Sequence, residues 1–428
     1  MAVALNLLEN YLYAVGYLLI NPLLYAFLFF IYWQYRKQMI WERQLFSVRL
    51  HSPLVQTLRG LGMGIVGGLF VSLLAAVLGI YVQVTDMWIA WTLALILALF
   101  RVRFLCLAYG TAIFTALHGV ALLVPFVDTV PGVGMVWRWF ANANPAPLLA
   151  LVGLLHLMEA WFIRTNRGAD ASPLFIEGKR GRIIGAYQLQ AFWLAPVIVL
   201  SPVAGSGLDI PAFYPGWPLF SPEMASASLG LLLLPAVTGF SALTKIHTPQ
   251  AKAKSISKHL VWYSLLLVGL SYAAVLYSPV VYVAAFFAFF GHEFIGWLSN
   301  RQEAKGQPYY VPHSRGLKVM AVLPDTPADN MGIQIGEVIV KVNGSLIQRK
   351  EDLYTALQIN PAFCKMEVLT RQNEIKFVQS AIYAGMHHQL GIIVVPDERT
   401  KEFVSMRVVD KISKKAIAQQ KKEQGLGA

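Results

Sequence analysis

Charged residues are scarce in this sequence. Only 14% of its 428 residues are Asp, Glu, Lys or Arg, whereas a soluble domain averages about 25%. So few charges cannot cover the water-exposed surface of a soluble protein of this length, which excludes an ordinary cytosolic enzyme. A hydrophobic share of 56% and a mean hydropathy of +0.54 exclude a disordered chain. The remaining class is an integral membrane protein.

Cysteine is scarce as well. Cys106 and Cys364 are the two in the sequence, and one distant pair provides neither a disulfide framework nor a Cys-x-x-Cys motif. The net charge of +12 would suit a nucleic-acid partner, but basic cytoplasmic loops account for it in a membrane protein. We therefore expect contact with membrane lipid and none with nucleic acid.

The charges that are present lie mostly near the C-terminus. Residues 301–428 carry 18 Lys+Arg and 13 Asp+Glu, whereas the much longer stretch 1–300 carries 17 and 10. The later part therefore has the charge density of a soluble domain. The sequence predicts a polytopic membrane domain at 1–300, a linker at 301–309, a small soluble domain at 310–396 and a charged tail at 397–428.

Long apolar runs recur through the first 300 residues. Crossing a bilayer core of about 30 Å requires roughly 20 apolar residues in a helix, and we expect about nine spans, or eight. The fold class is thus an α-helical polytopic membrane domain followed by a small α+β domain. The runs cover approximately 11–33, 60–82, 86–100, 104–127, 147–163, 183–203, 226–243, 260–277 and 280–298.

Basic residues gather in alternate loops between these runs. Together with Arg101 and Arg103, the segments 34–59, 164–182 and 244–259 contain 16 of the 17 basic residues before position 300. Cytoplasmic loops carry the excess of Lys and Arg. We therefore expect a multi-pass protein of the cell membrane, with its N-terminus outside and its C-terminal domain in the cytoplasm.

Five ionisable side chains fall within the expected spans: His118, His156, Glu159, His292 and Glu293. His156 and Glu159 share one helix face because they are three positions apart. Charge is costly inside a bilayer, so such residues mark either a path for an ion or proton, or polar pairing between helices. We favour the structural role of helix pairing and keep a small-solute transporter as an alternative.

An intramembrane metalloprotease is a second alternative. It would need His-Glu-x-x-His, which places two metal ligands on one helix face. The chain has His292-Glu293-Phe294-Ile295-Gly296, so the second histidine is missing. The sequence also contains neither a serine-nucleophile arrangement nor a phosphate loop. We therefore expect a non-enzyme with no metal and no cofactor.

The soluble part has the pattern of a small mixed domain. Strands are predicted at 317–323, 337–342, 364–370, 374–380 and 390–395, with a helix at 350–358. The stretches 315–319, 323–328, 332–339 and 342–344 resemble a PDZ domain of bacterial type. Glu337 stands where that pattern usually has Asp.

The PDZ resemblance implies a peptide-binding groove between a strand and a helix, filled by strand addition. Transferred to this sequence, its residues are Ser314, Arg315, Gly316, Leu317, Lys318, Val319, Leu353 and Leu357. Gly316 would let backbone N–H groups turn toward a carboxylate. The alternative is that Gly316 only begins a strand whose edge is covered.

The whole architecture resembles the MinJ family, membrane proteins that set division-site topology in Gram-positive rod bacteria. The resemblance rests on Leu7-Leu8-Glu9-Asn10, on Gly291-His292-Glu293-Phe294 and on the single C-terminal PDZ pattern. It implies an adaptor at the division septum and cell poles, which links a DivIVA-like coiled-coil scaffold to the inhibitor pair MinC and MinD. Other membrane proteins of the divisome are implied as further partners.

The tail at 397–428 is basic and polar. Its segment 408–422 could form a helix on anionic lipid. The alternative is a solvated, unstructured end.

Overall fold

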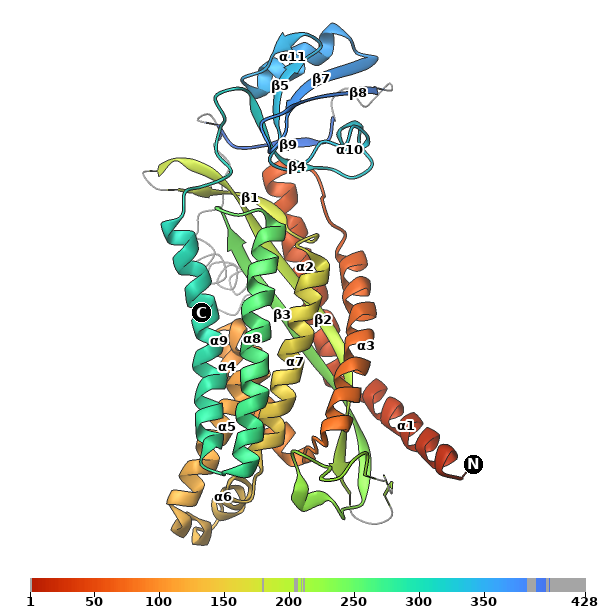
Figure 1. The fold of residues 1–428 in the computed structure, drawn as a ribbon, viewed down its shortest axis with the longest axis vertical. Helices are drawn as coiled ribbons and strands as arrows, with labels where there is room; N and C mark the ends of the chain where they lie inside the picture. The colour runs from red at the N-terminus through yellow and green to blue at the C-terminus, as the bar shows by residue number, and fades with distance from the viewer. Residues whose placement is uncertain are drawn as a thin grey trace, which may run out of the picture.

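The fold was analysed in a computed structural model that describes residues 2–178, 181–203, 207, 208, 210, 212–382, 390–397 and 400. Figure 1 shows a long bundle with a small domain at one end. Apart from Asp397 and Thr400, the expected charged tail lies outside the described residues.

The bundle is built mainly of helices. Its N-terminal half contains α1 (Ala2–Ile20), α2 (Pro22–Phe46), α3 (Pro53–Leu78), α4 (Val84–Phe100), the 3₁₀ turn η1 (Val102–Leu105), α5 (Leu107–Leu123), the 3₁₀ turn η2 (Pro125–Thr129) and α6 (Gly134–Ala141). After α7 (Pro145–Asn166) come three strands and the short η4 (Pro222–Met224), followed by α8 (Pro249–Leu276) and α9 (Val280–Lys305).

Two of the nine expected helical spans are strands, so the prediction was wrong there. β1 (Ser172–Glu177), β2 (Ile183–Pro202) and β3 (Leu229–Thr244) form an antiparallel sheet in the order β1-β2-β3. Both segments have a proline at their centre, Pro196 and Pro235, and these residues face each other across the sheet. Proline inside a helix costs about 3 kcal/mol or more, which disfavours helices at these two places.

Helix α3 lies directly against the backbone of β2. Gly60, Gly64 and Gly68 are so close to it that a Cβ at each would lie 2.0–2.5 Å from a strand carbonyl oxygen. Four helical residues rise about 6.0 Å and two strand residues about 6.6 Å. Every fourth residue of α3 therefore lies beside every second residue of β2. Further along, the Ile198 N–H donates to the Ser72 hydroxyl, 2.8 Å away. The polar backbone of β2 is thereby covered inside an apolar bundle, as a lipid environment requires.

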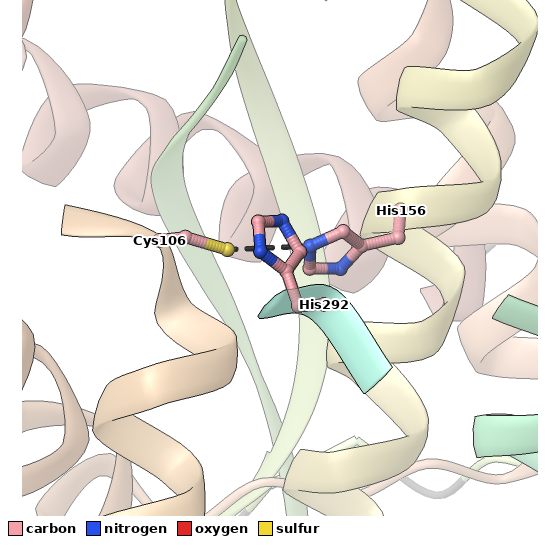
Figure 2. Close-up of side chains that lie close together, drawn as sticks. All are labelled: Cys106, His156 and His292. Carbon is pink, nitrogen blue, oxygen red and sulfur yellow. Dashed lines mark hydrogen bonds between the residues drawn. The ribbon is translucent and has the colours of Figure 1, made fainter. Parts of the chain in front are cut away.

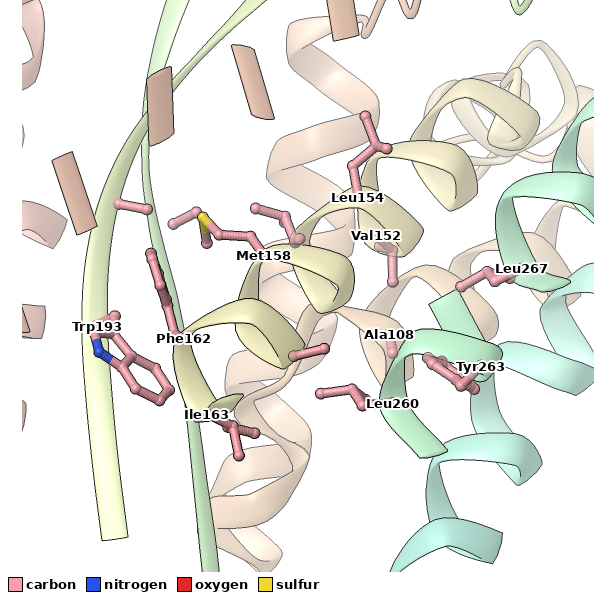
Figure 3. Close-up of a cluster of buried hydrophobic side chains, with 14 of the residues drawn as sticks. Ala108, Val152, Leu154, Met158, Phe162, Ile163, Trp193, Leu260, Tyr263 and Leu267 are labelled. Carbon is pink, nitrogen blue, oxygen red and sulfur yellow. The ribbon is translucent and has the colours of Figure 1, made fainter. Parts of the chain in front are cut away.

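Helix α7 is the centre of the bundle. Its side chains are buried on nearly every face, and it packs against β2 on one side and α8 on the other. Figure 3 shows Phe162 of α7 beside Trp193 of β2, with Leu260 and Tyr263 of α8 on the opposite side. An all-round apolar sequence is what a fully enclosed helix needs.

The expected spans 86–100 and 104–127 correspond to the short helices α4 and α5, which η1 joins. Arg103 of η1 pairs with Glu293, at the middle of α9 (Nη2 to Oε2, 3.0 Å). Cys106 lies 3.2 Å from His156 at the middle of α7. The turn therefore lies halfway along the neighbouring helices and not at an end of the bundle, so it is not the basic loop that we expected.

The bundle has the exterior of a membrane protein. Large apolar side chains such as Leu73, Leu266 and Phe286 are exposed on α3, α8 and α9, where a soluble protein would carry polar groups. Among the described residues, α3, α7, α8 and α9 are long and apolar enough to cross a membrane. The pair α1–α2, bent by 56°, brings the number of candidate helical spans to five.

The small domain follows the predicted element order closely. Its strands are β4 (Leu317–Val322), β5 (Val338–Val342), β6 (Ser345–Leu346), β7 (Phe363–Leu369), β8 (Ile375–Ala381) and β9 (Ile392–Val394), and its helices are α10 (Pro327–Asn330) and α11 (Lys350–Ile359). The sheet order is β8-β7-β5-β4-β9, with β6 on β5.

The joint between the bundle and the small domain is tightly bonded. Helix α9 continues to Lys305, past the expected boundary at 300. Its Glu303 accepts hydrogen bonds from the Lys252 ammonium (2.8 Å) and from the Lys245 N–H (2.9 Å). The carbonyl of the fully buried Tyr310 accepts from the Gly185 N–H of β2 at 2.9 Å. The Glu303 bonds fix the end of α9 to the start of α8, and the Tyr310 bond fixes the beginning of the small domain to β2.

Candidate functional site

The structure brings some of the predicted intramembrane polar residues together and leaves one apart. His156 of α7 and His292 of α9 face each other with ring centroids 5.3 Å apart. His118 of α5 lies elsewhere, where its Nδ1 is 2.8 Å from the Phe140 carbonyl oxygen and its ring stacks on Tyr282. His118 thus links α5 to α6 and α9.

A cysteine that the sequence analysis had set aside completes the group. The Cys106 Sγ lies 3.2 Å from the Nε2 of His156, and Figure 2 shows the thiol and the two imidazoles converging from three separate elements. One ligand atom from each of Cys106, His156 and His292 lies within 4.8 Å of the others. The clue in the sequence was a lone thiol in an apolar run, only three residues after Arg103.

Tyr109 connects this cluster to Glu293. Its hydroxyl donates to Glu293 Oε1 at 2.7 Å and lies 2.8 Å from His292 Nδ1. The other oxygen of Glu293 accepts from Arg103. Glu293 therefore does not need to reach the aqueous end of its helix, because Tyr109 and Arg103 satisfy it within the bundle.

Glu159 lies one turn after His156 on the same helix. Its side chain is only 6% exposed, and it makes no hydrogen bond or ion pair with the described part of the chain. His156, Cys106 and Tyr263 are ionisable groups that interact with it electrostatically. An unpaired carboxylate in such a place is energetically costly.

In the small domain, the predicted groove strand is not available. β4 pairs with β5 through Leu317 and Lys318, and with β9 through Val319 and the residues that follow. The prediction that a peptide adds along β4 is therefore wrong, since both edges of this strand are already hydrogen bonded. The alternative considered for Gly316, a strand entry with a covered edge, fits the structure.

The residues expected to bind a carboxylate are mostly engaged within the protein. A Cβ on Gly316 would lie 2.1 Å from the Ile339 carbonyl oxygen, and the Gly316 N–H donates to the His313 carbonyl. The Lys318 ammonium donates to the Tyr309 carbonyl at 2.6 Å and lies over the Tyr309 ring. Burial lowers the pKa of Lys318. Among the predicted loop residues, Ser314 and Arg315 have exposed side chains.

The two helix residues predicted to line the groove lie in the core of the domain. Leu353 and Leu357 of α11 are buried, and they belong to the same apolar cluster as Val319. Ile392 and Val394 of β9 pack against this cluster while staying half-buried. Within the described residues, β9 has a strand on one side only. No described strand therefore pairs with its second edge, while the neighbouring Ile393 and Val395 are buried in the core of the bundle.

The fold and the site together define the class of protein: a bundle with helices long and apolar enough to cross a membrane, joined to a PDZ domain. The family model of the PDZ domain matches residues 318–371. The cell division topological determinant MinJ of Bacillus subtilis (strain 168) is 30% identical over 347 residues, which cover 80% of this chain and 81% of that protein. The chain belongs to the MinJ family.

A second relative agrees with this placement. A probable cell division topological determinant MinJ of Lacticaseibacillus paracasei is 27% identical over 267 residues, covering 60% of this chain and 68% of that protein. No solved structure matches the chain.

Proposed function

We propose that this protein is a cell division topological determinant that works as a membrane-anchored adaptor. Its small domain would recruit one division regulator, while the bundle holds that domain at the membrane. The observation that carries the proposal is the MinJ relationship, which extends over 80% of the chain and includes both the bundle and the PDZ domain. By this proposal the protein is not an enzyme.

The proposed partners are a DivIVA-like coiled-coil scaffold, a MinD-like ATPase with MinC, and other divisome membrane proteins. Confinement to a membrane raises the effective concentration of the small domain toward other membrane-bound proteins. Two separate contact surfaces, one on the small domain and one on the bundle, would make a bridge between scaffold and inhibitor. The proposed location is the septum and the cell poles.

The proposed peptide site is the open edge of β9. Strand addition needs unpaired backbone groups and an apolar surface for alternate side chains. In the described part of the chain β9 offers both, because no strand pairs with its second edge and because Ile392 and Val394 are half-buried against the core that holds Leu353 and Leu357. A short apolar peptide segment is the ligand that fits.

Deletion of residues 310–396 tests the adaptor role. We expect a membrane-inserted protein that no longer places a fluorescent MinD-like partner at the septum of the native bacterium. Membrane fractionation checks that the shortened chain is still inserted. Unchanged septal placement of the partner would contradict recruitment through the small domain.

A pair of point variants tests the strand edge within the intact chain. Ile392→Lys should reduce recruitment because it adds charge beside β9, whereas Phe377→Lys on the opposite edge strand β8 should leave it unchanged. Phe377 is a suitable control because its side chain is exposed and on the other side of the sheet. Equal loss in both variants would argue against β9 as the site.

A further inference from the structure

We propose that Cys106, His156 and His292 form a binding site for a zinc ion within the helical bundle. The three residues come from the start of α5, the middle of α7 and the middle of α9. No His-Glu-x-x-His motif is involved. The tertiary fold supplies the second histidine and the thiol that the local sequence around His292 lacks.

The first support is the spacing of the donor atoms. A tetrahedral zinc ion with bonds of about 2.0–2.3 Å holds its ligand atoms roughly 3.3–3.7 Å apart. Here Cys106 Sγ and His156 Nε2 are 3.2 Å apart, and all three ligand atoms lie within 4.8 Å of one another. These separations are close to those that a tetrahedral zinc ion requires.

The second support is how the two imidazoles are held. His156 Nδ1–H donates to the Val152 carbonyl at 2.8 Å, which leaves its Nε2 lone pair facing Cys106. The Tyr109 hydroxyl donates to Glu293 and therefore accepts from His292 Nδ1–H, leaving Nε2 of His292 free. Metal-bound histidines are typically oriented in this way, by a hydrogen bond from the second ring nitrogen.

The third support is Glu159, the buried carboxylate without a hydrogen bond in the described part of the chain. It lies within electrostatic range of Cys106 and His156. A dication beside it would offset the cost of a buried negative charge. Its carboxylate is not among the ligand atoms that lie within 4.8 Å of one another, so the fourth position of a site with three protein ligands is left for water.

The donor set selects the metal. Calcium and magnesium need oxygen ligands, whereas one thiolate with two imidazoles suits zinc. On binding, the Cys106 thiol loses its proton to solvent and the sulfur becomes a zinc ligand. The ion would then connect α5, α7 and α9, the last of which leads directly into the PDZ domain.

Metal analysis of full-length protein purified in detergent tests the site. After loading with zinc and gel filtration, wild-type protein should retain a single zinc ion per chain, and Cys106→Ser and His292→Asn should lose it. Matched controls are Cys364→Ser, which removes the other cysteine, and His118→Asn, which removes a histidine outside the cluster. Both controls should retain the metal.

Cobalt in place of zinc gives a direct view of the ligands. Wild-type protein should show the visible bands of tetrahedral Co²⁺ and a sulfur-to-cobalt charge-transfer band, and Cys106→Ser should lose the latter. Thermal unfolding of each variant without metal checks that it is folded. Wild-type protein that binds no more zinc or cobalt than Cys106→Ser would overturn the proposal, as would equal loss in Cys364→Ser.

Discussion

At the scale of single residues, Glu42 shows how the bundle satisfies a buried charge. Its Oε2 accepts from the N–H groups of Leu50 and His51, and its Oε1 accepts from the Ser172 hydroxyl and contacts His51 Nδ1 at 2.6 Å. One carboxylate thus joins α2, the turn before α3 and the start of β1. Charge-assisted bonds of this kind are stronger than neutral ones.

The His51–Glu42 pair makes stability depend on pH. Burial lowers the pKa of His51, but the hydrogen bond and attraction to Glu42 outweigh it and raise the pKa above its ordinary value. The stabilisation from protonated His51 is full below the unfolded-state pKa of about 6.5. It is lost as the pH rises through the higher folded-state pKa.

We therefore expect His51→Gln to destabilise the protein by about 1–3 kcal/mol at mildly acidic pH and by much less at alkaline pH. Thermal unfolding of both proteins in detergent across this range gives the comparison. A difference that does not change with pH would show that the pair makes no pH-dependent contribution.

Single residues also show what sequence reasoning misses in the small domain. The sequence pattern correctly places Gly316 and Lys318 at the entry to a strand, but it assigns them to ligand binding. In the structure a β5 carbonyl occupies the space beside Gly316, and the Tyr309 carbonyl accepts a hydrogen bond from the Lys318 ammonium. A pattern of residue types predicts a strand, but it does not tell which neighbour covers each edge of that strand.

At the scale of elements, the contact between α3 and β2 depends on glycines at one helix face. Gly64 would bring a Cβ within 2.0 Å of the Leu194 carbonyl oxygen, whereas a Cβ at Gly62, on another face, meets nothing within 4 Å. Both lie inside the same helix. Alanine at Gly62 therefore measures helix propensity alone, whereas alanine at Gly64 also measures the packing of the helix on the strand.

Gly64→Ala should destabilise the protein by about 1–3 kcal/mol, because the added methyl group forces helix and strand apart. Gly62→Ala should instead stabilise it by about 0.5–1 kcal/mol, the usual gain for alanine in a helix. Thermal unfolding in detergent distinguishes the two. Equal effects at both positions would contradict the close packing of α3 on β2.

Two elements explain why the membrane domain was predicted only in part. The segments 183–203 and 226–243 are apolar enough for spans, and a short apolar run cannot be assigned to helix or buried strand from hydropathy alone. Pro196 and Pro235 were the available signal against helices. The pairing of β2 with β3, and the cover that α3 provides, are long-range contacts that hydropathy does not encode.

At the scale of the whole molecule, the basic segments of the sequence lie toward one end of the bundle. β2 and β3 take the place of two expected helical spans, and the turn between α4 and α5 lies halfway along the neighbouring helices. Figure 1 shows α1 at the end of the bundle opposite to the small domain. The basic segments 34–59 and 244–259, and residues 164–178, reach the small-domain end, where Arg59 contacts Asp170. Since basic loops are typically cytoplasmic, we expect this end to face the cytoplasm.

This orientation predicts that the small domain is reachable only from the cytoplasm. Cys364 is unsuitable as a probe because it is fully buried, and burial raises its pKa to about 12. Lys365→Cys combined with Cys364→Ser places an exposed thiol next to it. A membrane-impermeant maleimide should label this protein in opened cells and not in intact cells.

Cys364→Ser alone is the control for this labelling experiment, since it reports any reaction at Cys106. Labelling of the added cysteine in intact cells would show that the small domain lies outside the cell, opposite to the proposed orientation. It would also exclude recruitment of cytoplasmic partners through β9.

The sequence by itself determined the family of the protein and nearly every element of the PDZ domain. Those features follow from local motifs and short-range periodicity, which each segment carries independently of the rest. The tertiary structure alone decided that two apolar segments pair as strands, that β4 is an inner strand, and that Cys106 meets His156 and His292. Each of these depends on contacts between segments far apart in the chain, and no local pattern records which distant partner a residue will meet.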